Sequence, residues 1–200
     1  MSNLTATAKG ASTRDAILDH AYGIACCAGL EGLSIGPLAQ SVGMSKSGVF
    51  AHFGSREELQ LAVMDSAAKR FVAHVMLPAL KRPRGIPRLR AIIEAWFDWV
   101  RHNDGGCLLL TAVGEYDDRP GVLRERVVAQ QAQWRDELAR AVALAVEEGH
   151  LRADTDGQEL AFEISALALA VHHDAGLFGY EPARARGLRA FERLIRSYSS

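Results

Sequence analysis

A short run of residues, from Ser45 to His52, combines hydroxyl groups, one cation and very small side chains. Hydroxyl and ammonium groups hydrogen-bond to phosphate oxygens and to base edges in DNA. Small residues such as Gly48 and Ala51 let a helix backbone sink into a major groove, which is about 12 Å wide. An exposed helix with these residue types could therefore read duplex DNA. The residues expected on its outer face, with Phe50 and His52 at the edges, are Lys46, Ser47, Gly48 and Ala51.

Two short helices joined by a tight turn are expected to present this run. Ser34 is suited to cap the first helix, which is predicted to reach about Val42, and Gly43 then allows a sharp turn. Ser45 is expected to cap the second helix, from Lys46 to about His52. The proportions are those of a helix-turn-helix.

Packing between the two helices should leave the outer face of the second one free. Leu38 and Val42 give the first helix a small apolar face, and Val49 and Phe53 can pack across it. A pattern of this size also occurs as a plain packing element, so it does not by itself establish DNA binding.

Helical patterns continue along the rest of the chain. A first helix is expected over residues 13–28, with Ser12 as its cap, and a long one from Ser55 to Leu77, opened by the capping box of Ser55 and Glu58. The remaining apolar periodicities predict helices near 89–100, 107–116, 123–149, 160–171 and 188–198. Strand patterns are missing, and the alanine-rich composition favours helices, so an all-α fold of nine helices is predicted.

Length and composition exclude several classes of protein. The 200 residues are 48% hydrophobic and 24% charged, which is ordinary for a globular protein and unlike a disordered or collagen-like chain. The net charge of −1 gives no bulk signal for nucleic acid or membrane. Three cysteines form no disulfide framework or zinc spacing, and no apolar run is long enough to span a bilayer. A cytoplasmic, soluble protein without cofactor or bound metal is predicted.

Three regions are expected along the chain. Residues 1–11 are small and polar and predict a flexible arm. Residues 12–55 would form the helix-turn-helix domain, and residues 56–200 a second helical domain.

The stretch from Arg14 to Phe71 resembles the DNA-binding domain of the TetR family of transcriptional regulators. The resemblance lies in a hydroxyl residue opening the first short helix, the turn and Ser-Lys pair that follow, an aromatic before a His-Phe pair, and a Ser-Arg-Glu-Glu-Leu cap. These positions are Ser34, Gly43, Met44, Ser45, Lys46, Phe50, His52, Phe53 and Ser55 to Leu59. The resemblance implies the nine-helix plan of that family and a role in regulating transcription, by default repression.

The resemblance also implies a role for each matched position. Phosphate contacts would fall to Ser34, Lys46, Phe50 and His52, and base contacts to Ser47, Gly48 and Ala51, next to the cap residue Ser45. The aromatic position is usually tyrosine in this family, and Phe50 lacks the hydroxyl that would bond a phosphate. Gly48 has no side chain with which to read a base.

Two further partners are implied by the resemblance. A second copy of the chain would pack against the last two helices, and the pair would bind a roughly palindromic operator. The residues expected in that dimer contact are Leu160, Ile164, Leu167, Val171, Leu188, Phe191 and Ile195. A small apolar or aromatic effector would release the DNA, and its expected contacts are Trp96, Trp99, Val100, Cys107, Tyr116, Trp134 and His172.

Two alternatives remain open from the sequence. A helical enzyme would draw acid and base groups from His172, Asp174, Glu115 or Tyr116, although no nucleophile elbow, phosphate loop, dinucleotide fingerprint or metal motif is present. A ligand-binding or interaction module would use the same helices without DNA.

Overall fold

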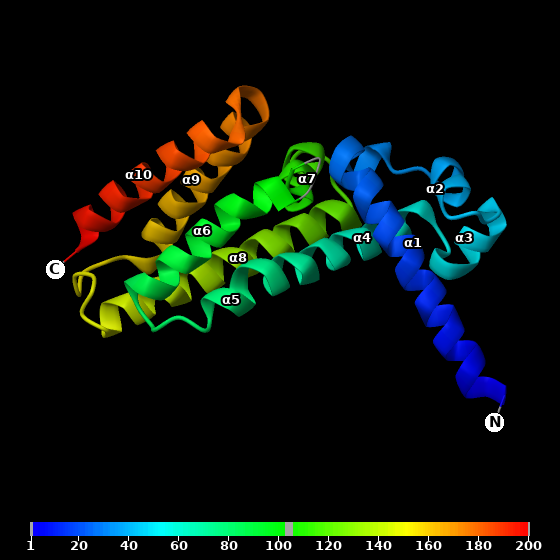
Figure 1. Cartoon of the computed structure of the whole chain (residues 1–200), viewed down its shortest axis with the longest axis horizontal. Coiled ribbons are helices and arrows are strands. Elements are labelled where there is room, and N and C mark those ends of the chain that lie inside the picture. Colours follow the sequence, from blue (N-terminus) through cyan, green and yellow to red (C-terminus); the bar gives the residue numbers. More distant parts are fainter. Residues whose placement is uncertain (1, 103–105, 200) are drawn as a thin grey trace. The chain divides into compact units, whose positions relative to one another are not determined.

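The computed structural model describes residues 2–102 and 106–199, which fold into helices joined by turns (Figure 1). In chain order the elements are α1 (Ser2–Gly32), α2 (Ile35–Ser41), α3 (Lys46–Phe53), α4 (Arg56–Phe71), the π-helical turn η1 (Val72–Met76), α5 (Leu77–Ala79), α6 (Ile86–His102), α7 (Leu108–Tyr116), α8 (Val122–Glu147), α9 (Gly157–Phe178) and α10 (Tyr180–Tyr198).

The predicted all-α class and number of helices are confirmed. Because α4, η1 and α5 follow one another without a break, they form one long helix, and the described residues then contain nine. The β pairing within the described ranges is a single bridge between Leu151 and Ser199.

The N-terminal segment differs from its prediction. Met1 lies outside the described residues, and α1 begins at Ser2, so the segment expected to be a flexible arm is helical from residue 2 onward. The segment is rich in alanine and contains no proline, and nothing in it stops a helix from extending past Ser12. The predicted end is better placed, because the helical backbone breaks at Gly29, where φ is 74°.

The chain divides into two compact units, and neither is continuous in sequence. Unit 1 comprises residues 1–69 and 108–127, and unit 2 comprises residues 70–107 and 128–200. The expected single boundary between residues 55 and 56 therefore does not match the packing. The first part of α4, all of α7 and the start of α8 belong to the same unit as α2 and α3.

Unit 1 has its own hydrophobic core, built around the inner faces of α1, α2, α3 and α4 and completed by α7. Ile17, Leu38, Val49 and Leu59 are fully buried in it, and Leu108 of α7 is almost fully buried. Burial of this kind removes apolar side chains from water and fixes the two short helices, which are too short to be stable alone.

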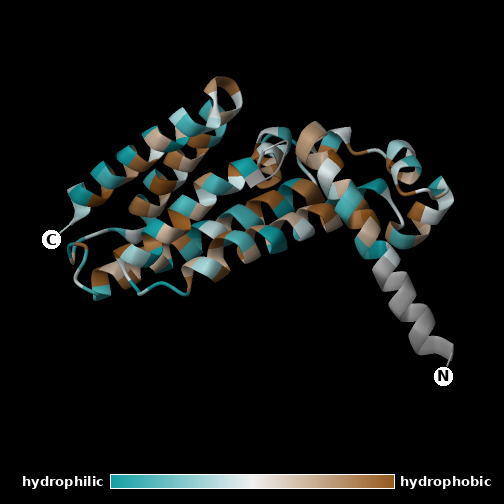
Figure 2. Ribbon diagram, in the orientation of Figure 1, coloured by the Kyte–Doolittle hydropathy of each residue, from teal (hydrophilic) through white to brown (hydrophobic). Residues whose placement is uncertain are grey.

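Unit 2 contains α6, most of α8, and the α9–α10 pair, whose helices lie side by side (Figure 1). The close approach of α9 and α10 depends on Gly187. A Cβ at that position would lie 2.3 Å from Val171 Cγ2 and 2.9 Å from Phe97 Cε2, so any larger residue would force these side chains to move. Hydrophobic and hydrophilic residues alternate around the helices of unit 2 (Figure 2), and no helix in the described ranges is long and apolar enough to cross a membrane.

The apolar stripes expected to form the dimer contact instead face the interior of unit 2. Five of the seven residues are at most 3% exposed: Leu160, Ile164, Val171, Phe191 and Ile195. Leu167 and Leu188 are partly buried. Side chains that fill the core of unit 2 present almost no surface to a partner, so the burial of these five residues does not support their predicted place in a dimer contact. Their periodicity arises from packing within unit 2.

Candidate nucleic-acid interface

The two short helices form where the sequence predicts them. In α3, Ser45 is the N-cap and its Oγ accepts a hydrogen bond from Gly48 N at 3.1 Å. Gly43 in the preceding turn has a φ of 66°, which favours glycine, and Gly54 ends α3 with a φ of 76°. Ser34 occupies the N-cap position of α2 with extended backbone, but its side chain makes no capping bond.

The predicted contact residues lie on the surface of unit 1. Val49 is fully buried and Phe53 is 7% exposed, so these two side chains anchor α3 against the core. The other side of α3 and the start of α2 are open to solvent. The exposed predicted residues are Ser34, Ser45, Lys46, Ser47, Phe50 and Ala51, while Gly48 and His52 are partly exposed.

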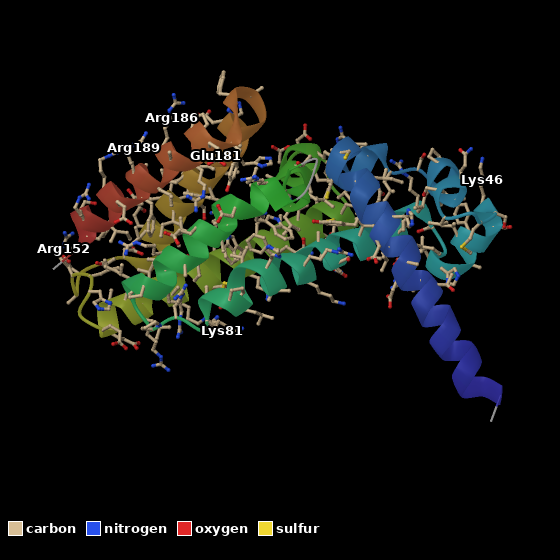
Figure 3. The ribbon with its side chains drawn as sticks, in the orientation of Figure 1. Lys46, Lys81, Arg152, Glu181, Arg186 and Arg189 are labelled. Atoms are coloured by element: carbon tan, nitrogen blue, oxygen red, sulfur yellow. The ribbon has the colours of Figure 1, made fainter. Side chains whose placement is uncertain are left out.

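Lys46 lies where α2 and α3 meet, at the surface of unit 1 (Figure 3). A Cβ on Gly36 would lie 3.3 Å from Lys46 Cε and 3.6 Å from its Nζ, so the lysine side chain passes over the first turn of α2. The ammonium group thus lies over the first turn of α2 and is exposed, so an anion such as a DNA phosphate could reach it.

Hydroxyl groups extend the same surface. Ser45 Oγ and Ser47 Oγ lie 3.0 Å apart and share a hydrogen bond, which orients both hydroxyls at the start of α3. Ser55 caps α4 by accepting from Glu58 N at 3.0 Å, as the capping-box pattern predicts. Arg14 of α1 lies over the Phe53 ring at 4.9 Å and covers the far end of α3. The surface is therefore polar, with one exposed cation on α3.

Residues outside the predicted DNA-contact set hold the segment that leads into α2. Gln60 is only 4% exposed and donates to Leu30 O at 2.7 Å, and Tyr116 OH donates to Glu31 Oε1 at 2.7 Å. Arg56 donates to Leu33 O and Glu31 O, at 3.0 and 2.6 Å. Sequence periodicity does not single out these residues, because their partners are 23 to 85 positions away in the chain.

The predicted effector contacts divide between the two units. Tyr116 belongs to unit 1, where its buried hydroxyl is bonded to Glu31, apart from the other predicted contacts. The other six belong to unit 2. In that unit Trp96 and Trp134 pack edge to face around Phe71, with ring centroids 6.1 and 4.8 Å away, and Trp99 does the same at 5.9 Å.

Two of the predicted effector residues have a buried polar atom without a hydrogen-bond partner among the described residues. Trp134 Nε1 and His172 Nδ1 form no hydrogen bond with the part of the chain that the structure describes. Burial, and to a smaller degree His173, holds the pKa of His172 below its ordinary value. Cys107 is 1% exposed, and Val100 is partly buried. Within the described ranges, no three histidine, cysteine or acidic side chains gather in a way that could hold a metal ion.

Comparison with known proteins supports a regulatory role for this arrangement. Residues 17–63 match the model of the family described as "Bacterial regulatory proteins, tetR family", and residues 85–191 match "Tetracyclin repressor-like, C-terminal domain". The first match covers α2, α3 and, of the supporting residues, Arg56 and Gln60 but not Tyr116.

Individual relatives agree with the family match. The chain is 31% identical over 104 residues to the HTH-type transcriptional activator FasR of Mycolicibacterium smegmatis, a match that covers 52% of this chain and 47% of that protein. The chain thus spans about half the length of this curated relative. A TetR transcriptional regulator from Chloroflexus aurantiacus has the same fold, with a TM-score of 0.80, 26% identity and 94% of each chain covered.

A further solved structure, AibR in complex with isovaleryl coenzyme A and operator DNA, has a TM-score of 0.70 at 22% identity and covers 87% of this chain and 95% of its own. The second family match alone spans more than half of the 200 residues. Together with the helix-turn-helix of unit 1, these matches show that the chain belongs to the TetR family of DNA-binding transcriptional regulators.

Proposed function

We propose that this chain regulates transcription by binding duplex DNA with the exposed side of α3, and that it represses the genes whose operators it occupies. The observation that carries the proposal is the combination of two buried anchors, Val49 and Phe53, with a polar outer face that only solvent covers within unit 1. Such a helix can enter a major groove without unfolding its support.

The exposure of residues on α2 and α3 supports the individual contacts that we propose. Lys46 would bind one phosphate, and the exposed Ser34, at the N-cap position of α2, would bind another part of the backbone. Ser47, Gly48 and Ala51 would face the base edges, where their small size lets the backbone approach closely. Phe50 is 43% exposed and would pack on the sugar-phosphate backbone, since it has no hydroxyl to donate.

The protein would act as a homodimer joined through the exposed side of α9. Phe162, Leu169 and Leu177 are 54%, 49% and 63% exposed, and their spacing places them along one side of the helix with the exposed Ala166 and Ala170. Three large apolar residues on one exposed helix face favour coverage by another protein surface. Two copies related by a two-fold axis would cover each other with the same face.

A shallow groove beside this face could receive a partner side chain. It has a volume of about 340 Å³, and small or apolar residues form its floor: Leu167, Ala170, Val171, Ala183, Gly187 and Ala190. Arginines 186, 189 and 193 of α10 border it, and Figure 3 shows Arg186 and Arg189 pointing away from the helices. An apolar centre with a charged rim is typical of a protein interface.

A small effector would bind in unit 2 near the tryptophan cluster. The rings of Phe71, Trp96 and Trp134 give an apolar and aromatic surround, and Trp134 Nε1 offers a donor that has no partner among the described residues. His172 Nδ1 offers a second polar atom. An apolar or aromatic molecule with one or two acceptor groups suits this chemistry. AibR, a relative of the same fold, has been solved in complex with both a small molecule and operator DNA.

Selection of DNA from a random duplex library would test the central claim. Purified protein should enrich a roughly palindromic sequence with half-site centres about 34 to 36 Å apart. A variant carrying Lys46→Ala and Phe50→Ala should lose the enrichment. If the native protein enriches no sequence, the DNA-binding proposal fails, and the interaction-module alternative takes its place.

Two measurements would test the remaining parts. In transcription reactions with the selected operator placed at a promoter, added protein should lower transcript yield, and an increase would show an activator instead. Because all three tryptophans lie on α6 and α8, a small molecule that binds there should change the intrinsic fluorescence. The same molecule should weaken operator binding, and by linkage the operator should weaken its binding by an equal factor.

A further inference from the structure

We infer that Glu115 and Tyr116, the last two residues of α7, are positioning residues that fix how α2 and α3 are presented to DNA. This inference rests on the proposed operator binding. The two side chains do not contact the outer face of α3. They hold the corner between α1 and α2, which comprises residues 29–34, from behind.

Glu115 fills the space at the break in α1. At Gly29 the backbone leaves the helical conformation with a φ of 74°, and a Cβ there would lie 2.0 Å from Glu115 Oε1. The carboxylate accepts a hydrogen bond from Leu30 N at 2.9 Å and lies 3.4 Å from Glu31 N. A glycine is thus required both by its φ and by the approaching carboxylate, which binds backbone amides next to the break.

Tyr116 binds the same corner through a buried hydroxyl. Its OH donates to Glu31 Oε1 at 2.7 Å and accepts from Gln60 Nε2 at 3.4 Å, while Gln60 also donates to Leu30 O at 2.7 Å. Tyr116 and Gln60 are each 4% exposed. A buried polar group that loses its hydrogen-bond partner destabilises the fold. This cluster therefore favours the single arrangement of residues 29–34 in which all its bonds are made.

Glu31 joins the α7 residues to the start of α4. Its carboxylate lies 3.3 Å from Arg56 Nη2 and 3.7 Å from Arg119 Nη1. The hydrogen bond from Tyr116 is the main reason that the pKa of Glu31 lies below its ordinary value; burial opposes it, and both arginines lower the pKa further. Arg56 also donates to Leu33 O, one residue before the N-cap of α2.

Through these contacts α7, which lies outside the helix-turn-helix, helps to set the position of α3. The chain passes from unit 2 into unit 1 immediately before α7 and returns to unit 2 at residue 128. Any shift of α7 must therefore change the bonds that hold residues 29–34. In a dimer, a small rotation of that corner alters the separation of the two α3 helices, so operator spacing should report on these bonds.

A panel of operators that differ by single base pairs between their half-sites would test this inference. Native protein should favour one spacing sharply. In Glu115→Ala and Tyr116→Phe, the preference for that spacing over its neighbours should fall by about fivefold, roughly what one net hydrogen bond is worth in an equilibrium. Glu115→Gln keeps an acceptor and should retain more of the preference than Glu115→Ala. Asp118→Asn, an exposed neighbour, is the matched control and should keep the native preference.

The outcomes separate the inference from the proposed function. If native protein binds no selected operator, the proposed function fails and the inference falls with it. If native protein shows a sharp preference and Tyr116→Phe keeps it, with a native thermal midpoint that proves the variant is folded, the inference alone is overturned. Should Glu115→Ala not fold, the Tyr116→Phe result decides.

Discussion

The contact surface of α3 assigns separate tasks to neighbouring side chains. Lys46 carries the exposed charge of the helix and lies over the first turn of α2, whereas Ser47 carries a neutral hydroxyl that is bonded to Ser45. Charge contributes to affinity for any duplex, and a hydroxyl near base edges contributes to choice among sequences. Replacing Lys46 should therefore change affinity for all DNA, whereas replacing Ser47 should change sequence preference.

Replacing Lys46 should weaken binding to every sequence alike. For Lys46→Ala we expect a shallower dependence of affinity on salt, by about one phosphate contact per subunit, with the ranking of operators unchanged. Ser47→Ala should instead reduce the difference in affinity between the selected operator and unrelated duplexes. Fluorescence anisotropy at several salt concentrations would measure both. Lys81→Ala removes an exposed lysine from unit 2 and should leave the salt dependence as it is.

His172 makes the stability of unit 2 dependent on pH. Burial lowers its pKa in the folded state below the ordinary 6.5, so the unfolded chain takes up a proton at a higher pH than the folded one does. This contribution to stability is complete above that value and is lost as the pH falls toward the folded pKa. Between pH 7.5 and 5.5 the native free energy of unfolding should fall more than that of His172→Gln, as measured by urea titration. The same change at the exposed His20 should preserve the native drop.

At the scale of helices, local signals predicted some features and longer-range packing decided the others. The cap at Ser45, the cap at Ser55 and the turn at Gly43 depend only on residues a few positions away, and all three occur as predicted. The side of α9 that faces the core could not be inferred in the same way. This helix has apolar residues on two sides, and packing against α10 and α6 determines that Ile164 is buried and Leu169 exposed.

The packing partner of α7 could not be predicted either, because it lies far away in the sequence. Its sequence predicts an apolar helix, but nothing local indicates that it packs with α1 rather than with the helices that precede it. The bonds of Glu115 and Tyr116 span 84 and 85 positions in the chain. A pattern with a period of 3.6 residues contains no information on such pairs.

The Ser45 cap gives α3 a test at this scale. Ser45→Ala leaves Gly48 N without its partner and should lower the free energy of unfolding by about 1 kcal/mol. Ser45→Asp restores the acceptor and should recover most of the stability, yet its carboxylate would repel DNA phosphate, so operator affinity should stay low. Ser41→Ala removes a hydroxyl bonded to a carbonyl and not to an amide, and should change stability by less than about 0.5 kcal/mol. Recovery of DNA binding in Ser45→Asp would contradict the proposed approach of DNA phosphate to the start of α3.

For the whole molecule, binding to a two-fold operator depends on pairing the two copies. The five buried stripe residues stabilise unit 2, so changing them would unfold the protein and say nothing of the dimer. The exposed Leu169 is a better probe, because a charge there remains in water when the chain is alone and becomes buried only if a partner covers α9.

Leu169→Glu should therefore convert a dimer into a folded monomer, as measured by size-exclusion chromatography with light scattering. Its operator affinity should fall steeply, because the second half-site is then no longer bound within the same complex. Leu80→Glu is a close match, since Leu80 is also 49% exposed in unit 2 but lies just after α5, and this variant should remain dimeric. If both variants keep the native mass, α9 is not the contact. If the native protein is itself a monomer at micromolar concentration, two α3 helices cannot be fixed at one spacing by this face, and the pairing would have to form on the DNA.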